Sequence, residues 1–309
     1  MSTLSQPFDP LTFSAIPAGT ADNGATLSQA DFQIIAALVH RETGILITQA
    51  RKTMLVSRLT RRLRHLGVTD FSSYIQLLTG PHGQEERQAL ISVVTTNVTG
   101  FFREPHHFDR LSTLAPHFLD RAKAGMRVRI WSAGCSTGQE AYSIAATLLQ
   151  AAPELAQHDL LVLGTDIDPE VVQRARAGVY SLPAGLSPGL ARLAPFVSAS
   201  SPEGSVEISA ALKAITRFEV LNLLDRWPFS RGFDVIFCRN VVIYFDSDTR
   251  LKLWSRFASL LPEGGTLFLG HSERMDPLLE KVFVPVGITE YRRAAGALPA
   301  QPEPGQGPH

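Results

Sequence analysis

Polar residues follow several short apolar runs of this chain, and their chemistry suits a nucleotide-like ligand. The run VRIW is followed by SAGCSTGQE, where small residues around Gly134 let a ligand approach the backbone. The run LLVLGT ends at Asp166, an acidic residue that can accept hydrogen bonds from a ribose diol. Asp168 precedes Pro169 and is expected to cap the next helix instead. The alternatives are a tight strand-to-helix turn for the glycine segment and compensation of a helix dipole for Glu140.

Two further apolar runs end in a pair that contains a polar residue. FEVL is followed by Asn222 and Leu223, and DVIFC is followed by Arg239 and Asn240. Ligands of open α/β sheets bind outside the carboxyl ends of the strands, so these pairs are candidate site residues. Tyr244 follows the second pair and is expected near the same crevice. The alternatives are that the asparagines form turns and that Tyr244 is a core aromatic.

The segment TTNVTGFFREPHHF is unusually polar for a linker. It contains Asn97, Thr99 and Arg103, besides two adjacent histidines. His106 and His107 are not expected to bind a metal, because adjacent residues do not share a helix face and no acidic cluster accompanies them. The sequence therefore predicts no metal site.

Hydrophobic periodicity divides the chain into regions of different structure. Residues 27–92 show helical spacing, which predicts a small bundle of about four helices. Residues 128–293 alternate short apolar runs with helical stretches, which predicts an α/β domain with an open, mostly parallel sheet. Residues 93–127 are expected to form a linker helix region. Residues 180–217, with four prolines and several glycines, are expected to form a small insertion subdomain.

The composition of the 309 residues is that of an ordinary folded protein. Apolar residues make up 44%, and 29 basic and 29 acidic side chains cancel, so a charged partner must be inferred from local clustering. Residues 1–26 and 294–309 are expected to be disordered tails. Cys135 and Cys238 are too few for a disulfide framework. The absence of a long apolar run or a signal-like start predicts a cytoplasmic protein without membrane insertion.

Taken together, the motifs resemble the CheR family of chemotaxis receptor glutamate O-methyltransferases, which use S-adenosylmethionine (SAM). The matching segments cover roughly residues 30–292 and are RLTRRLRHLG, TTNVTGFFREPHHF, WSAGCSTGQEAYSIA, GTDIDPEVVQRARAGVY, FEVLNLLDRWPF, FDVIFCRNVVIYFD and LLPEGGTLFLGHSE. The resemblance implies an N-terminal helical bundle followed by a Rossmann-like SAM-dependent methyltransferase domain with a small β-rich insertion.

The resemblance also implies roles for individual residues. It implies that SAM is contacted by Asn97, Thr99, Arg103, Glu140, Asp166, Asn222, Leu223, Arg239 and Asn240. Gly134 is a tenth predicted contact, which follows from its position after an apolar run. Arg103 and Tyr244 are the family positions considered for catalysis. The product, S-adenosylhomocysteine, is expected to compete for the same crevice.

Two positions depart from the family pattern. The first acid of the common TGEE motif is Gln139 here, although Glu140 is retained. In tether-binding members a glycine-containing insertion loop grips a peptide at the receptor's C-terminus. Residues 196–209 are shorter and lack those glycines early in the loop, which argues against peptide tethering.

Methyl transfer to a carboxylate needs alignment more than acid–base chemistry. A glutamate with a pKa of ~4.3 is already a nucleophile at neutral pH, so no general base, metal or covalent intermediate is required. The expected work of the protein is to align the reacting groups and to exclude water. Arg103 and Tyr244 are predicted to orient the carboxylate.

A cluster of basic residues predicts how the protein binds its partner. Between residues 49 and 66 the chain carries no acidic residue and six basic ones, which are Arg51, Lys52, Arg58, Arg61, Arg62 and Arg64. A solvated helix face normally interleaves both signs of charge. No aromatic residue accompanies these charges as a nucleic-acid stacking platform requires, so nucleic acid is not the expected partner. An acidic helical surface, such as the cytoplasmic methylation region of a chemoreceptor, is favoured and matches the family's expected role for this helix.

Two other functions remain open from the sequence. One is a SAM-binding regulatory module without turnover, against which the presence of Arg103 and Tyr244 argues. The other is a methyltransferase acting on a different protein substrate, because the basic cluster does not say which protein is modified.

Overall fold

The fold is described by a computed structural model that covers residues 26–181, 188–200 and 204–296. A seven-stranded sheet forms its centre, in the order β6-β2-β1-β7-β8-β10-β9. The first five strands in this order are parallel, whereas β10 is antiparallel to both of its neighbours. The strands are β1 (Val128–Ala133), β2 (Leu160–Asp166), β6 (Thr216–Val220), β7 (Val235–Cys238), β8 (Thr266–Leu269), β9 (Phe283–Gly287) and β10 (Glu290–Arg293). The predicted α/β fold is confirmed.

The order of the strands creates a switch point beside β1. The chain moves outward from β1 to β2 and β6 in one direction, and it then returns to place β7 on the other side of β1. Connections that leave a parallel sheet in opposite directions open a crevice at the carboxyl ends of the strands. The ends of β1 and β7 therefore flank the natural ligand-binding position of this fold.

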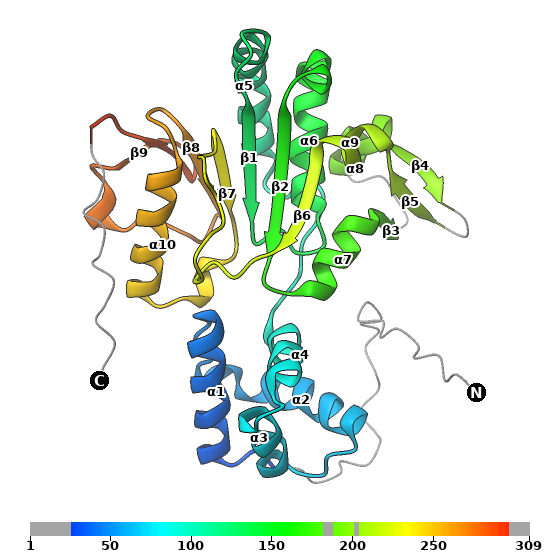
Figure 1. The fold of residues 1–309 in the computed structure, drawn as a ribbon, viewed down its shortest axis with the longest axis vertical. Coiled ribbons are helices and arrows are strands. Elements are labelled where there is room, and N and C mark those ends of the chain that lie inside the picture. Colours follow the sequence, from blue (N-terminus) through cyan, green and yellow to red (C-terminus); the bar gives the residue numbers. More distant parts are fainter. Residues whose placement is uncertain (1–25, 182–187, 201–203, 297–309) are drawn as a thin grey trace.

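Helices cover both faces of the sheet (Figure 1). One core cluster packs residues of α5, α6, α7 and α9 on one face, and a second packs α10 on the other. The helix expected in the linker region, α5, packs along α6 as part of this layer. The bounds are α5 (Pro105–Lys123), α6 (Gln139–Ala151), α7 (Pro169–Ala177), α9 (Ala210–Ile215) and α10 (Ser247–Leu260).

The predicted N-terminal bundle forms a helical domain with its own core. Its helices are α1 (Gln29–Thr43), α2 (Lys52–Leu66), α3 (Phe71–Thr79) and α4 (Gln84–Val94). Side chains at helical spacing, among them Ile35, Leu59 and Tyr74, are fully buried between these helices. Ser28 and Asp70 cap α1 and α3 by accepting a backbone N–H of the first turn.

A small antiparallel sheet interrupts the larger domain, as predicted for the β-rich insertion. Its strands are β3 (Val179–Ser181), β4 (Val197–Ser200) and β5 (Ser205–Ile208) in the order β3-β5-β4, with α8 (Pro188–Leu193) beside them. Part of the insertion loop, and nearly all of the two predicted tails, lie outside the described residues.

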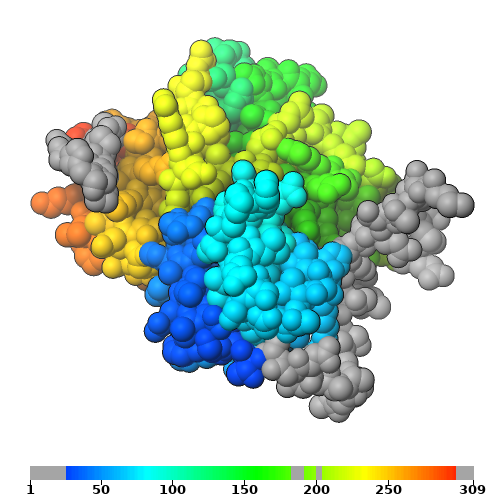
Figure 2. Space-filling view, turned by 60° about the horizontal axis from the view of Figure 1, so that its bottom comes forward, coloured from blue at the N-terminus to red at the C-terminus, as the bar shows by residue number. Residues whose placement is uncertain are grey.

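The helical domain lies at the carboxyl ends of β1 and β2 (Figure 1), and Figure 2 shows it seated against the sheet domain on this face. The N–H of Leu46 donates to the carbonyl of Tyr244 at 2.8 Å. His40 Nε2 lies 2.8 Å from Asp246 Oδ2. The loop after α1 is thus joined to the segment after β7, which places the helical domain over the switch point.

The two cysteines and the hydropathy of the helices bear on two predictions from the sequence. Cys135 and Cys238 are both buried, and neither forms a disulfide. Among the described residues, no helix combines the length and the apolar character needed to cross a membrane.

Candidate functional site

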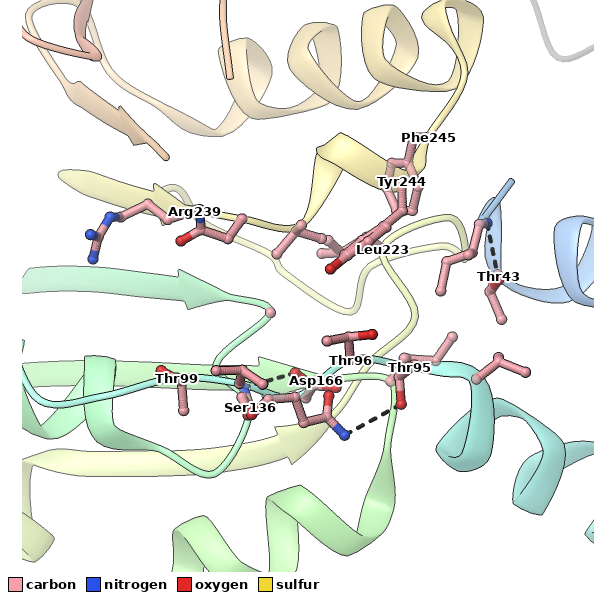
Figure 3. A pocket seen from close by; sticks show the side chains of 18 of the residues that line it. Thr43, Thr95, Thr96, Thr99, Ser136, Asp166, Leu223, Arg239, Tyr244 and Phe245 are labelled. Carbon is pink, nitrogen blue, oxygen red and sulfur yellow. Dashed lines mark hydrogen bonds between the residues drawn. The ribbon is translucent and has the colours of Figure 1, made fainter. Parts of the chain in front are cut away.

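A cavity that is partly open to solvent lies at the switch point, with about 1020 Å³ of empty space when its solvent-open part is included. All ten predicted cofactor contacts line it, and so does Tyr244. Figure 3 shows side chains on opposite sides of the cavity: Leu223, Arg239 and Tyr244 on one, and Thr95, Thr96, Thr99, Ser136 and Asp166 on the other. The structure therefore brings the candidate residues together from strand ends that are far apart in the sequence.

Asp166 is a buried carboxylate with acceptor capacity to spare. It is 9% exposed, and its two oxygens accept the backbone N–H groups of Ser136 at 2.8 Å and Asp168 at 3.1 Å. A carboxylate offers about four acceptor positions, so two remain for hydroxyl donors. Burial raises the pKa of Asp166 to about 6, and the nearby Asp168 carboxylate adds to that rise. As predicted, Asp168 instead caps α7.

Gly134 is required by a close approach between two strand ends. Its φ of 84° is in the left-handed region, and a Cβ there would lie 2.3 Å from Val241 Cγ2. The turns after β1 and β7 therefore touch at this point. Gly134 therefore belongs to a tight strand-to-helix turn, and the same turn lines the cavity.

Arg239 and Glu140 form a buried ion pair. Nη1 of Arg239 donates to Glu140 Oε2 at 2.9 Å, and Ser132 Oγ donates to Glu140 Oε1 at 2.7 Å. Nη2 of Arg239 lies 3.2 Å from Glu104 Oε2 and donates to the carbonyl of Arg103. Arg239 is 6% exposed and Glu140 9%. Their charged groups hold the segment that carries Arg103 against the sheet, and they leave little surface for a ligand.

Hydrogen bonds hold the segment around Asn97 at the carboxyl ends of β1 and β2. Asn97 Nδ2 donates to Asp168 Oδ2 at 2.9 Å, and Ser136 Oγ donates to the carbonyl of Asn97 at 2.8 Å. Ser92, near the end of α4, donates to Asp168 Oδ1 at 2.8 Å. The cap of α7 therefore also positions the chain that connects the two domains.

Two cavity residues of the helical domain, Thr43 and Ile45, were not predicted from the sequence. Thr43 and Ile45 line the cavity from the end of α1, and Figure 3 shows Thr43 at its edge. Asn222 Nδ2 donates to the carbonyl of Glu42 at 2.8 Å, so this predicted cofactor residue also joins the domains. No local pattern indicates Thr43 or Ile45, whereas Ser136 lies within the SAGCSTGQE motif that drew attention to this turn.

Two arginines and a tyrosine border the same cavity. The Arg51 guanidinium lies 4.5 Å from the centre of the Tyr244 ring, within the range of a cation–π contact. Arg103 Nη1 donates to the carbonyl of Val98 at 3.2 Å. Arg51 belongs to the basic cluster of the sequence, so the structure links that cluster to the cavity.

The six basic residues of the cluster differ in their contacts within the protein. Arg62 makes a bidentate pair with Glu86, at 3.0 and 2.6 Å, and Arg58 donates to three carbonyls at the end of α4. Both arginines therefore join α2 to α4. The acidic partner of Arg62 belongs to a different helix from Arg62 itself. Arg61 and Arg64 are exposed, and Arg51 and Lys52 are half-buried.

His106 and His107 lie closer to an acid than the sequence suggested. Their rings are 4.2 Å apart, and together with Glu104 they place three potential metal-ligand atoms within 4.8 Å of one another. Burial lowers the pKa of His107 to about 3, and the charge of Arg239 reinforces this shift. Because the Arg239 guanidinium lies 3.2 Å from the Glu104 carboxylate, that carboxylate already has a cationic partner.

The fold and the site define a class, that of α/β proteins that bind a nucleoside at the carboxyl ends of parallel strands. Two family models match the chain. They are described as "CheR methyltransferase, all-alpha domain", over residues 30–95, and "CheR methyltransferase, SAM binding domain", over residues 97–292. The chain belongs to the CheR methyltransferase family, and its methyl donor is SAM. The cavity fits that ligand, because it lies at the carboxyl ends of the parallel strands and contains the buried carboxylate of Asp166, which has acceptor positions for ribose hydroxyls.

Relatives of known name extend over both domains. A probable chemotaxis protein methyltransferase of Rhizobium etli is 44% identical over 264 residues, which cover 84% of this chain and 98% of that protein. The chemotaxis protein methyltransferase of Escherichia coli is 41% identical, over 86% of this chain and 91% of that protein. The one from Salmonella typhimurium is 42% identical, over 82% and 87%.

Proposed function

We propose that this protein transfers the methyl group of SAM to glutamate side-chain carboxylates of chemoreceptors, giving glutamate methyl esters and S-adenosylhomocysteine. The observation that carries the proposal is that Arg51, Arg103 and Tyr244 border the same cavity as Asp166. Cationic and hydroxyl groups are suited to receive a carboxylate, and a buried acid is suited to receive a ribose. The relatives are named chemotaxis protein methyltransferases, which supports chemoreceptors as the proteins that are modified.

The proposed cofactor contacts follow the walls of the cavity. Asp166 accepts the ribose hydroxyls, and Gly134 borders the ligand at the turn after β1. Asn222 and Leu223 border the ligand from the end of β6. The remaining contacts are Asn97, Thr99, Arg103, Glu140, Arg239 and Asn240. Because the charges of Glu140 and Arg239 are engaged with each other, their contribution is to support the wall of the cavity.

The proposed catalytic residues act by orientation. Bound SAM supplies an activated methyl group, and the glutamate is already ionised at neutral pH. Arg103 and Tyr244 orient the incoming carboxylate, and Arg51 holds the Tyr244 ring by stacking on it. A tight ion pair would lower the nucleophilicity of the carboxylate, so a guanidinium that orients it from the wall is favoured over full neutralisation. The enclosure of the site by both domains excludes competing water.

The proposed docking surface is the outward part of the basic cluster. Arg51, Lys52, Arg61 and Arg64 face an acidic helical methylation region of the receptor, while Arg58 and Arg62 hold α2 in place. Arg51 connects this surface with the cavity, because it belongs to both. Such a receptor region lies in the cytoplasm, which is therefore the proposed location of the protein.

Labelled SAM tests the proposal directly. The purified protein is incubated with methyl-labelled SAM and the cytoplasmic fragment of a candidate chemoreceptor, and the labelled product is treated with base. A methyl ester releases labelled methanol, whereas an N-methyl group does not. A receptor fragment whose methylation-region glutamates are replaced by alanine is the matched control. Binding of SAM without transfer would indicate a regulatory module instead, and transfer to the control fragment would indicate a different modified residue.

A further inference from the structure

A buried carboxylate outside the predicted site accepts four backbone hydrogen bonds. Glu273 lies in the loop after β8 and is 3% exposed. Its Oε1 accepts the N–H groups of Val241 and Val242, at 2.9 and 3.0 Å. Its Oε2 accepts those of Asn240 and Gly270, at 3.0 and 2.6 Å. Such a concentration of donors on one carboxylate compensates for its burial and fixes the donating backbone.

Three of the four N–H groups belong to the turn that leaves β7. Asn240 begins this turn with a φ of 61°, a left-handed backbone conformation that residues other than glycine rarely adopt. Asn240 and Val241 line the cavity, and the short 3-10 helix η4 (Val242–Tyr244) that follows brings Tyr244 to it. The carboxylate of Glu273 thus stabilises an unfavourable backbone conformation directly before the proposed catalytic tyrosine.

The turn and the Glu273 loop approach too closely for a side chain at Gly270. A Cβ at that position would lie 2.7 Å from Asn240 Nδ2 and 2.8 Å from both Asn240 N and Glu273 Oε2. The GHSE segment of the sequence is therefore shaped to this contact: its glycine allows the approach and its glutamate supplies the acceptor.

We propose that Glu273 is a positioning residue, whose carboxylate holds the backbone of Asn240–Val242 so that Asn240 and Val241 meet the cofactor and Tyr244 meets the substrate. Glu273 lies behind the turn, outside the residues that line the cavity, and acts only through them. The part of this inference that concerns Tyr244 rests on the proposed function. The part that concerns SAM and its product does not.

Three variants separate a positioning role from a general contribution to stability. Glu273→Gln keeps the size of the side chain but turns an NH₂ group towards two backbone donors. Glu273→Asp keeps both oxygens on a shorter stem. Glu290→Gln is the control, because Glu290 is equally buried, at 5% exposed, pairs with Arg110 at 2.9 Å and does not line the cavity.

The measurements are amide hydrogen exchange, affinity for S-adenosylhomocysteine by calorimetry, and kcat and KM on a receptor fragment. For Glu273→Gln we expect faster exchange at residues 240–242, about tenfold weaker binding, and a larger loss in kcat than rise in KM. Glu273→Asp should fall between this variant and the wild type. Glu290→Gln should lower the melting temperature without any of these effects.

Wild-type affinity and wild-type exchange at residues 240–242 in folded Glu273→Gln would overturn the inference. If that variant does not fold, the same result for Glu273→Asp would overturn it. If the wild-type protein methylates no receptor, the proposed function fails, but exchange and product affinity still decide whether Glu273 positions the turn.

Discussion

The protonation state of a single residue, Asp166, decides whether the cavity can hold a ribose. Burial raises the pKa of this carboxyl to about 6. Since only the ionised form accepts both hydroxyls, the affinity for S-adenosylhomocysteine should be constant at higher pH and weaken as the pH falls below that value. The affinity should be about tenfold lower at about pH 5 than at about pH 8, as measured by calorimetry.

The variant Asp166→Asn is the control for this pH dependence, because an amide does not titrate in the range. We expect it to bind the nucleoside more weakly at every pH and with a flat profile. A sloping profile in Asp166→Asn would assign the titration to another group. A flat profile in the wild type would show that the Asp166 carboxylate does not receive the ribose.

The hydroxyl of Tyr244 gives a second prediction for a single residue. The Arg51 guanidinium lies 4.5 Å from the centre of the Tyr244 ring. In Tyr244→Phe the ring can still stack with this guanidinium, but the hydroxyl that orients the carboxylate is lost. We expect the affinity for S-adenosylhomocysteine to stay within about twofold and kcat to fall about tenfold or more. Single-turnover kinetics with labelled SAM measure the effect. Unchanged turnover would remove Tyr244 from the chemistry.

Among the elements, the contact between α2 and α4 depends on an ion pair whose acid is buried. Glu86 is 6% exposed and accepts two bonds from Arg62 and one from the hydroxyl of Tyr74, at 2.7 Å. Removing one partner leaves the others without compensation, so Glu86→Ala should lower the free energy of unfolding of the helical domain by about 3 kcal/mol. Urea titration followed by circular dichroism measures this loss. The exposed neighbour supplies the control: Glu85→Ala should change stability by less than about 0.5 kcal/mol.

The elements themselves could be predicted from local patterns, but their partners could not. Helices α6, α7 and α10 fall within residues 128–293, where helical stretches were predicted between apolar runs, because apolar spacing and capping residues act within a few residues of each other. The interpretation of α2 was less successful. A run of basic residues says nothing about a glutamate on another helix, so the pairing of Arg62 with Glu86 became visible only in the packed bundle.

In the whole molecule, residues of both domains form the candidate site. Strand ends are a local property of the sequence, and the topology of a parallel sheet brings them together, so the residues on that side of the cavity could be named in advance. Thr43 and Ile45 could not, because their position follows from how α1 docks on the segment after β7. The hydrogen bond from Asn222 to the carbonyl of Glu42 belongs to the same contact.

At the scale of the complete molecule the net charge is zero, whereas the proposed docking surface consists of four basic residues beside the cavity, so ionic strength should separate docking from cofactor binding. The KM for a receptor fragment should rise several-fold from about 0.05 M to about 0.3 M salt, while the affinity for S-adenosylhomocysteine, held in a cavity that is only partly open to solvent, should change little. Arg61→Glu should raise this KM at low salt and reduce its dependence on salt, with kcat nearly unchanged. Arg231→Glu reverses an exposed charge before β7, at the opposite end of the sheet. This variant should leave the KM and its dependence on salt as in the wild type. Equal effects of the two charge reversals would attribute the salt dependence to overall charge and would remove α2 from receptor docking.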